Sequence, residues 1–275
     1  MKGGRAEFSR GRWITLGPSL SVVLLTATSL WVAAEAASAQ TILNVERLQP
    51  GDVEGTHWGV EGEFSLSRGN NEVLDVLGGV VLGHRWEEQW LRSFVGFDYR
   101  SETGQPDESD QYLHVRYNHW WTERWQSFHF VQYQASRTSL LQLRALVGSG
   151  IRHRLVDGRT TFDVGTGVMQ EHENLDAERL SGVHPARPRV WRMANLFVGT
   201  RRLTEALRLV GVAYVQPDLS DFGDLRTLTD LSLQIALTDN VDLTVRGEWR
   251  RDARPPTGVR RSDVVLSTGF TVSFR

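Results

Sequence analysis

Apolar and polar residues alternate along most of the chain after residue 55. In the final stretch, SDVVLSTGFTVSFR, the apolar Leu266 and Phe270 share one parity, whereas Ser267 and Thr271 fall on the other. Successive side chains of a β-strand point to opposite faces, so this alternation predicts a strand with one apolar face and one small or polar face. The same pattern predicts twelve strands in all. They are His57–Ser67, Val73–His84, Gln89–Arg100, Gln111–Trp121, Trp125–Ser136, Leu141–Arg154, Thr160–Glu171, Val190–Arg202, Ala206–Gln216, Leu225–Leu237, Val241–Arg251 and Ser262–Phe274.

The predicted strands are long, and their connections alternate in length. Strands of soluble sandwiches have about 5–6 residues, whereas membrane barrel strands have about 9–11. Every second connection is short, as in RWEEQ, TER, LVDGR, LTEA and TDN, and most of the others are longer and polar, as in SETGQPDESD and DARPPTGVR. Short periplasmic turns, long outer loops and an even strand number are typical of outer-membrane barrels. We therefore predict an antiparallel transmembrane β-barrel of about twelve strands, with a soluble periplasmic β-sandwich as the alternative fold.

Tryptophan residues gather beside the short connections. Those that flank a short turn or open the first strand are Trp58, Trp86, Trp90, Trp120, Trp121 and Trp125. Such amphipathic rings settle where lipid meets water. Their positions predict an aromatic girdle at one membrane interface.

The first 39 residues have the organisation of a secretory signal peptide. A start with four basic residues precedes the apolar run LSVVLLTATSLWVAA, and the small residues Ala37, Ser38 and Ala39 follow. We expect cleavage after Ala39 and export, with a retained membrane helix as the alternative. Residues 40–55 are then expected to form a short periplasmic segment and residues 56–275 the barrel.

Composition excludes several classes of function. The chain has no cysteine, which excludes disulfides, thiolate metal sites and a cysteine nucleophile. Its formal net charge of -2 gives no electrostatic basis for binding nucleic acid. Hydrophobic residues make up 40% and charged residues 23%, as in an ordinary folded chain.

The faces opposite to the apolar ones carry full charges. In Val241–Arg251, for example, Arg246 and Glu248 oppose Val245 and Trp249. Unpaired charges do not persist in a dry core, so these faces are expected to line the barrel lumen. The predicted lumen-lining residues are Glu61, Glu63, Asp163, Asp242, Arg246, Glu248 and Arg250, and the same parity adds Arg144, Arg152, Arg226 and Asp230.

Two predicted strands deviate from this rule. Phe128 shares a face with Gln132, and Val210 and Val212 share one with Arg208. The direction of these two faces is left open by the pattern.

Catalytic and cofactor motifs are not found. None of the eight histidines lies in a His-Glu-x-x-His motif, and the sequence contains no Gly-x-Ser-x-Gly elbow. Twelve-stranded barrels include a phospholipase with an outward-facing serine and histidine, so a lipase-like enzyme is an alternative, but no matching signature is present. We expect no enzyme activity, no cofactor and no metal.

The predicted outer loops hold two kinds of charge cluster. One is acidic and offers oxygen ligands for a divalent cation, although a solvated loop is the simpler interpretation. It comprises Asp107, Glu108, Asp110, Asp218, Asp221 and Asp224. The other is basic, and Arg254, Arg260 and Arg261 are candidates for contact with lipopolysaccharide phosphates, with a plain solvated loop as the alternative.

Three stretches resemble one family. FSLSRGNNEVLDVLGG, LVGSGIRHRLVDGRTTFDVGTGV and the final hairpin with PPTGVRRSD in its loop are similar to a family described as salt-induced outer membrane proteins, the domain-of-unknown-function family 481. The resemblance covers roughly residues 56–274 and implies an outer-membrane barrel without an established activity, so no catalytic residue is carried over. Two features depart from the usual pattern: a long loop follows Glu171, and Arg275 follows the terminal aromatic Phe274.

Two functions then remain open. One is a narrow channel for ions or small solutes, and the other is a structural envelope protein linked to salt or osmotic stress. Expected partners are outer-membrane lipid and lipopolysaccharide, with the barrel-assembly machinery during biogenesis. The barrel is taken as a monomer by default, and localisation is expected in the bacterial outer membrane.

Overall fold

The computed structural model describes residues 42–46, 54–67, 73–102, 108–136, 141–175, 189–255 and 261–274. The expected signal peptide lies outside these residues. Among them there is no helix that is long and apolar enough to cross a membrane.

All twelve predicted strands are present. The strands are β1 Gly55–Ser67, β2 Val73–Trp86, β3 Gln89–Glu102, β4 Glu108–Trp120, β5 Trp125–Ser136, β6 Leu141–Val156, β7 Thr160–Leu175, β8 Arg189–Met193, β9 Asn195–Arg202, β10 Leu207–Pro217, β11 Leu225–Ala236, β12 Val241–Asp252 and β13 Ser262–Phe274. β8 and β9 together form the predicted strand Val190–Arg202. The break between them does not shift the register with β7, because Val168 pairs with Met193 and Gly165 with Leu196. They therefore count as one strand of a twelve-stranded barrel.

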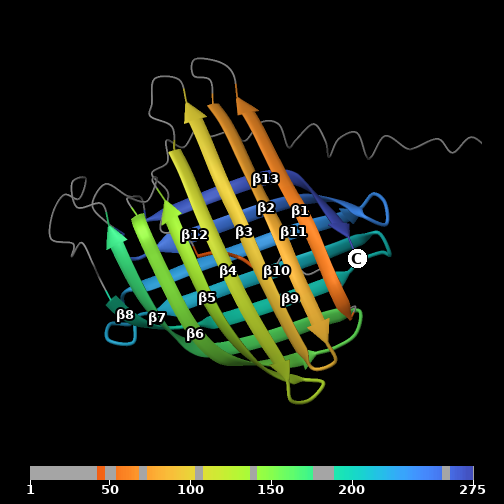
Figure 1. Ribbon diagram of the computed structural model, residues 1–275, viewed down its shortest axis with the longest axis horizontal. Coiled ribbons are helices and arrows are strands. Elements are labelled where there is room, and N and C mark those ends of the chain that lie inside the picture. The colour runs from red at the N-terminus through yellow and green to blue at the C-terminus, as the bar shows by residue number, and fades with distance from the viewer. Residues whose placement is uncertain are drawn as a thin grey trace, which may run out of the picture. The chain divides into compact units, whose positions relative to one another are not determined.

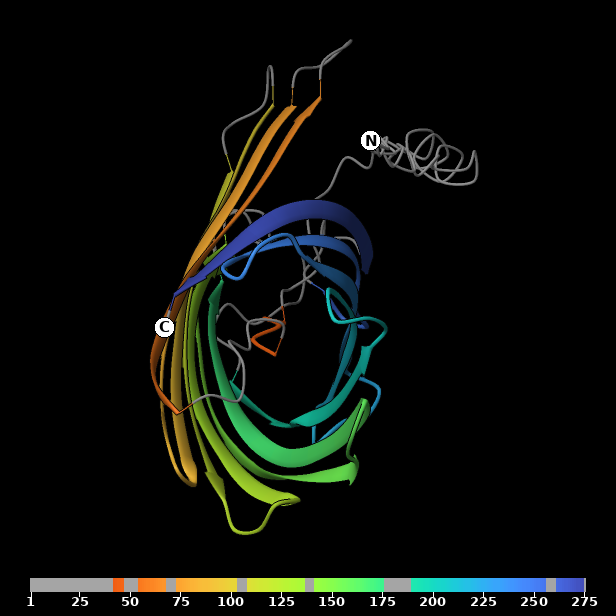
Figure 2. The same ribbon diagram turned by 90° about the vertical axis from the view of Figure 1, so that its right-hand side faces the viewer.

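The strands close into a ring (Figures 1 and 2). Neighbours in sequence pair antiparallel, and β1 pairs with β13 through Trp58 opposite Phe274. A closed sheet leaves no unpaired edge, which is what allows a barrel to stand in lipid. The predicted fold class is confirmed.

The outer and inner faces follow the predicted parity in most strands. Leu266 is 74% exposed on the outside of β13. Arg246 and Glu248 of β12 are buried inside the barrel, opposite in direction to the exposed Val245 and Trp249. The outer face is thus apolar, and the inner face carries buried charges beside apolar patches.

The aromatic girdle differs from the prediction at two positions. Trp58, Trp86, Trp121 and Trp125 are exposed, as a girdle requires, but Trp90 is buried and stacks on Trp120. Trp90 has the inward parity of Arg92 on β3, and Trp120 that of Arg116 on β4. Proximity to a turn suggested an interface for both rings, whereas strand parity places them inside.

The segment Ile42–Glu46 lies inside the barrel, and all five residues are buried (Figure 2). Ile42 packs in a cluster with Val212 of β10, and Leu43 and Val45 pack with Phe94 of β3. Residues 40–55 are predicted as a short periplasmic segment. Within that range the structure places residues 42–46 inside the barrel, and residues 40, 41 and 47–53 lie outside the described ones. The physical reason is that the apolar side chains of this segment are buried against apolar patches of the inner wall.

Candidate functional site

The charged side chains inside the barrel form three clusters. The Glu46 cluster consists of Glu46, Arg92, Arg116, Arg152 and Asp163. The Glu171 cluster consists of Arg144, Glu171, Glu173, Arg192, Asp224, Arg226 and Asp252. The Arg246 cluster consists of Asp230, Arg246, Glu248 and Arg250.

The Glu46 cluster joins the N-terminal segment to three strands of the wall. Arg116 Nη1 of β4 donates to Glu46 Oε1 at 2.5 Å, and Arg152 Nη1 of β6 donates to Oε2 at 2.8 Å. Arg92 Nη2 of β3 lies 3.7 Å from Oε1. Arg152 also binds Asp163 of β7 at 2.5 Å. One carboxylate therefore links three guanidinium groups across the lumen.

Arginine charge keeps Glu46 ionised. Complete burial alone raises the pKa of a carboxyl group, but the charges of Arg116, Arg152 and Arg92 outweigh it. The pKa of Glu46 consequently lies well below its usual range. Removal of this carboxylate would leave the buried Arg92 and Arg116 without compensation, which is the costly way to break a buried ion pair.

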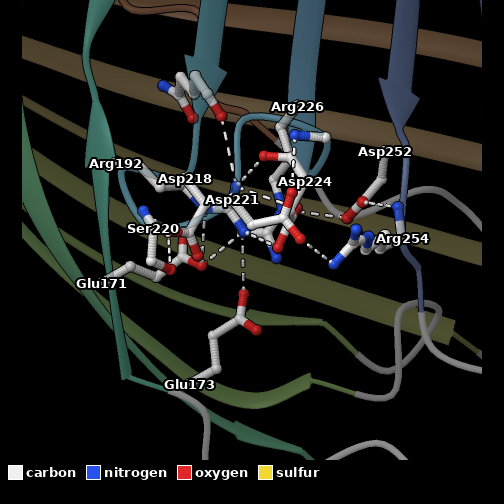
Figure 3. Close-up of polar contacts among 12 residues, drawn as sticks. Glu171, Glu173, Arg192, Asp218, Ser220, Asp221, Asp224, Arg226, Asp252 and Arg254 are labelled. Carbon is white, nitrogen blue, oxygen red and sulfur yellow. Dashed lines mark hydrogen bonds and ion pairs between the residues drawn. The ribbon is translucent and has the colours of Figure 1, made fainter.

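The Glu171 cluster crosses the lumen (Figure 3), and Glu171 and Glu173 lie in the last part of β7. Arg144 Nη2 of β6 donates to Glu171 Oε2 at 2.6 Å, and Arg226 Nη1 of β11 donates to Oε1 at 2.6 Å. Arg192 Nε of β8 donates to the same Oε1 at 3.4 Å. Glu173 lies 3.2 Å from Arg226. The cluster thus connects β7 to a strand that is not its neighbour in the sheet.

Two aspartates extend this cluster toward the loops. Arg226 Nε donates to Asp252 Oδ2 at 3.0 Å, and Arg192 Nη2 donates to Asp224 Oδ2 at 3.0 Å. In the same loop, Asp221 pairs with the exposed Arg254 at 2.7 Å. Two of the acidic loop residues therefore bind arginine rather than one another. Within the described residues, no group of three or more histidine, aspartate or glutamate side chains could hold a metal ion.

The Arg246 cluster lies on β11 and β12. Arg246 Nε donates to Asp230 Oδ2 at 2.6 Å, and Glu248 accepts from both Arg246 and Arg250. A cavity lined by Arg246 is also lined by Glu61 and Glu63 of β1. This part of the lumen brings together five of the seven predicted lumen residues.

The other predicted site residues lie away from the Arg246 cluster. Asp163 is buried in the Glu46 cluster, and Asp242 is half-buried near the end of β12 that follows a short turn. Arg254 pairs with Asp221, and Arg261 is exposed. Arg260, like Asp107 of the acidic loops, lies outside the described residues. Contact with lipopolysaccharide stays a prediction.

One outward serine–histidine pair was missed by the sequence analysis. Ser149 Oγ of β6 and His129 Nδ1 of β5 are 2.9 Å apart on the outer face. The two residues are directly opposite in register, whereas no motif spacing connects them in the sequence. Within the described residues, His129 also stacks on the ring of Tyr117. A hydrolase also needs an orienting group and oxyanion donors, and this pair alone supplies neither.

The most important residues that the sequence analysis missed are Glu46, Arg92, Arg116 and Glu171. Arg92 lies beside Trp90 and Phe94 on its face, so hydrophobic alternation does not reveal that this face turns inward. For Glu46 a signal was present. Glu46 ends the short apolar stretch ILNVE, which lies outside every predicted strand and therefore has no predicted partner to pack against.

Comparison with known proteins agrees with this fold. A family model described as "Protein of unknown function, DUF481" matches residues 63–274. The chain is similar in structure to the COG4313 outer membrane channel from Pseudomonas putida F1, at a TM-score of 0.53 and 12% identity, over 82% of this chain and 100% of that one. It is also similar to the NanC porin, at a TM-score of 0.47 and 10% identity, over 78% and 97%. No curated protein matches the sequence. The likeness to the first structure shows the fold of an outer-membrane barrel.

Proposed function

This chain belongs to the family of proteins of unknown function DUF481, and from the geometry of its interior we propose that it forms a narrow channel for ions or small solutes across the bacterial outer membrane. The observation that carries this proposal is the charged interior of a closed barrel whose outer face is apolar. Buried arginine and carboxylate side chains line the lumen from β3 to β12. Rings of charged side chains are how many pores select ions.

The channel is narrow for two reasons. Twelve strands enclose less space than the 16–18 strands of a water-filled porin. In addition, the Glu171 cluster spans the lumen from β7 to β11, and Ile42–Glu46 fills part of what remains. The lumen of this state is divided, so conduction requires these side chains or the N-terminal segment to move.

Selectivity provides the test of this proposal. Replacing Arg246 and Arg250 by alanine leaves Asp230 and Glu248, with the nearby Glu61, in an acid-rich stretch of the lumen. The double variant is therefore expected to shift the reversal potential toward cations in a planar bilayer under a KCl gradient. A conducting wild type whose reversal potential is unchanged by the double substitution would remove these residues from the pathway.

A purely structural envelope protein, linked to salt or osmotic stress, is the second candidate. It is favoured by the Glu171 cluster, which braces the lumen with buried ion pairs from β6 to β12. Absence of current from the folded wild type and from the double variant would support this role. Localisation in the outer membrane is part of both proposals, and fractionation of inner from outer membranes tests it.

A further inference from the structure

Arg92 and Arg116 have little of their charge balanced by the barrel itself. Within the described residues, Glu46 is the carboxylate that lies within 4.0 Å of either of them, and it belongs to the N-terminal segment rather than to the wall. Arg152 has a second partner in Asp163. Without Glu46, the wall would present two buried arginines that face the lumen without a counter-charge.

Several donor atoms of these arginines have no partner even when Glu46 is in place. In the described part of the chain, Nε and Nη1 of Arg92 and Nε and Nη2 of Arg116 are buried without a hydrogen-bond acceptor. Arg92 and Arg116 are 6% and 4% exposed. Buried donors of this kind are costly unless a ligand or water satisfies them. Glu46 therefore meets only part of the hydrogen-bonding capacity of this site.

A cavity adjoins one of these arginines, Arg116. It is lined by Arg116, His114 and Tyr214, together with apolar side chains such as Phe128 and Met169. His114 Nε2 and the Tyr214 hydroxyl are also buried without a partner among the described residues. Apolar walls with a few convergent polar groups are the usual lining of a small-molecule site.

We propose that Arg92, Arg116 and Arg152 form a binding site for the carboxylate of a small organic anion, and that Glu46 occupies this site as an internal competitor. The proposal rests on the proposed channel function, because it names the class of solute that the lumen takes. Planar guanidinium groups match the geometry of a carboxylate, and the unused donors of Arg92 and Arg116 are available to it.

Exchange of one carboxylate for another keeps the arginines paired. The Glu46 side chain can therefore leave without the large penalty of uncompensated buried charge, provided that an anion takes its place. Nine residue steps join Glu46 to Gly55 at the start of β1, and an extended chain of this length reaches about 30 Å. Departure of the segment would also remove Ile42, Leu43 and Val45 from the lumen.

Propionate is the appropriate probe, because it has the shape and charge of the glutamate side chain beyond its Cα atom. We expect Glu46→Ala, folded in detergent, to bind propionate in a calorimetric titration. The wild type is expected to bind it at least about tenfold more weakly, because a tethered carboxylate competes at a high effective concentration. Propionamide, which is uncharged, and the double variant Glu46→Ala/Arg116→Ala are the matched controls and should bind little.

Failure of the site and failure of the channel are distinguishable. If folded Glu46→Ala conducts in a planar bilayer but binds no propionate, or binds propionamide equally well, the arginine site is wrong and the channel stands. If Glu46→Ala binds propionate but neither the wild type nor Glu46→Ala conducts, the site stands and the channel is wrong. Should Glu46→Ala not fold, Glu46→Gln keeps the side-chain size. It should shift the reversal potential of a conducting protein toward anions, and an unchanged potential would overturn the proposal.

Discussion

The lipid-facing parity of β13 can be tested by one arginine placed at two adjacent positions. Leu266 points outward and is 74% exposed, whereas the neighbouring Ser267 is half-buried on the inner face. An arginine on the lipid face of a barrel costs about 2–4 kcal/mol at the bilayer midplane and about 0–1 kcal/mol near the interfaces. Leu266→Arg should therefore destabilise the barrel in lipid far more than Ser267→Arg.

The expected magnitude follows from the depth of Leu266. It lies two residues from Thr268, the middle residue of the 13-residue strand β13. With a rise of about 3.3 Å per residue and a strand tilt of about 40°, this places it about 5 Å from the midplane of an apolar band about 25 Å tall. The cost for Leu266→Arg is then about 2 kcal/mol, or about thirtyfold in the folding equilibrium constant.

Ser267→Arg is the matched control, because its side chain enters the cavity that Glu61 and Glu63 also line. It pairs in register with Arg246, whose charge opposes a second arginine, but the carboxylates of the cavity offset this repulsion. We expect a cost below about 1 kcal/mol, as for a partly exposed charge. The assay is urea unfolding of each variant in lipid vesicles. Equal losses, or a larger loss for Ser267→Arg, would refute the assigned parity.

Three further predictions concern processing and the buried charges. The intact mass of the membrane-purified protein should correspond to Gln40–Arg275, and a mass that includes residues 1–39 would contradict the signal peptide. Glu171→Ala should destabilise the barrel by about 3–5 kcal/mol in the same urea assay, because it strands buried arginines, whereas Asp221→Ala, which removes an exposed ion pair, should cost at most about 1 kcal/mol. Because the pKa of Glu46 is lowered in the folded state, its stabilising effect is complete above its ordinary value of about 4.5 and is lost as the pH falls below it. The stability difference between wild type and Glu46→Gln should thus stay constant above that pH and shrink below it, and a difference that shrinks near neutral pH would be inconsistent with this pairing.

The strands and their faces could be predicted because successive side chains of a strand point to opposite faces, so that apolar and polar residues alternate in the sequence. The prediction worked best where the outer face is apolar, and Ser262–Phe274 was predicted without error. The predicted strand Thr160–Glu171 ended too early, because β7 continues to Leu175. There the outward residues are polar, and Asn174 donates a hydrogen bond to Gln142 of β6. Hydrophobic alternation therefore gives no signal in this part of the strand.

Two irregularities of the sequence are explained by the N-terminal segment inside the lumen, but the sequence alone does not show that they belong together. Phe128, Val210 and Val212 give parts of the inner wall an apolar character. Ile42 and its neighbours form an apolar stretch without a strand to pack against. Each irregularity explains the other once Ile42 is seen to pack against Val210 and Val212. Only the closed barrel brings these positions together.

The partners of the charged residues also depend on closure. Parity predicted that Arg226 points inward, but its partner Glu171 is 55 positions away and lies on a strand that is not adjacent. Which charges meet across the lumen is set by the stagger of the strands around the ring. Some of the lumen charges could therefore be predicted from the sequence, but Glu46, Arg92, Arg116 and Glu171 and the three clusters could not.

The central claim is that the lumen is a pathway for small ions, and single-channel recording tests it most directly. Purified wild-type protein in a planar bilayer with symmetric KCl should give discrete current steps that are much smaller than those of a 16-stranded porin measured in parallel. The same preparation, heat-unfolded before addition, is the control and should give no steps. Silence of the folded protein over repeated insertions, or steps as large as those of the porin, would contradict the account.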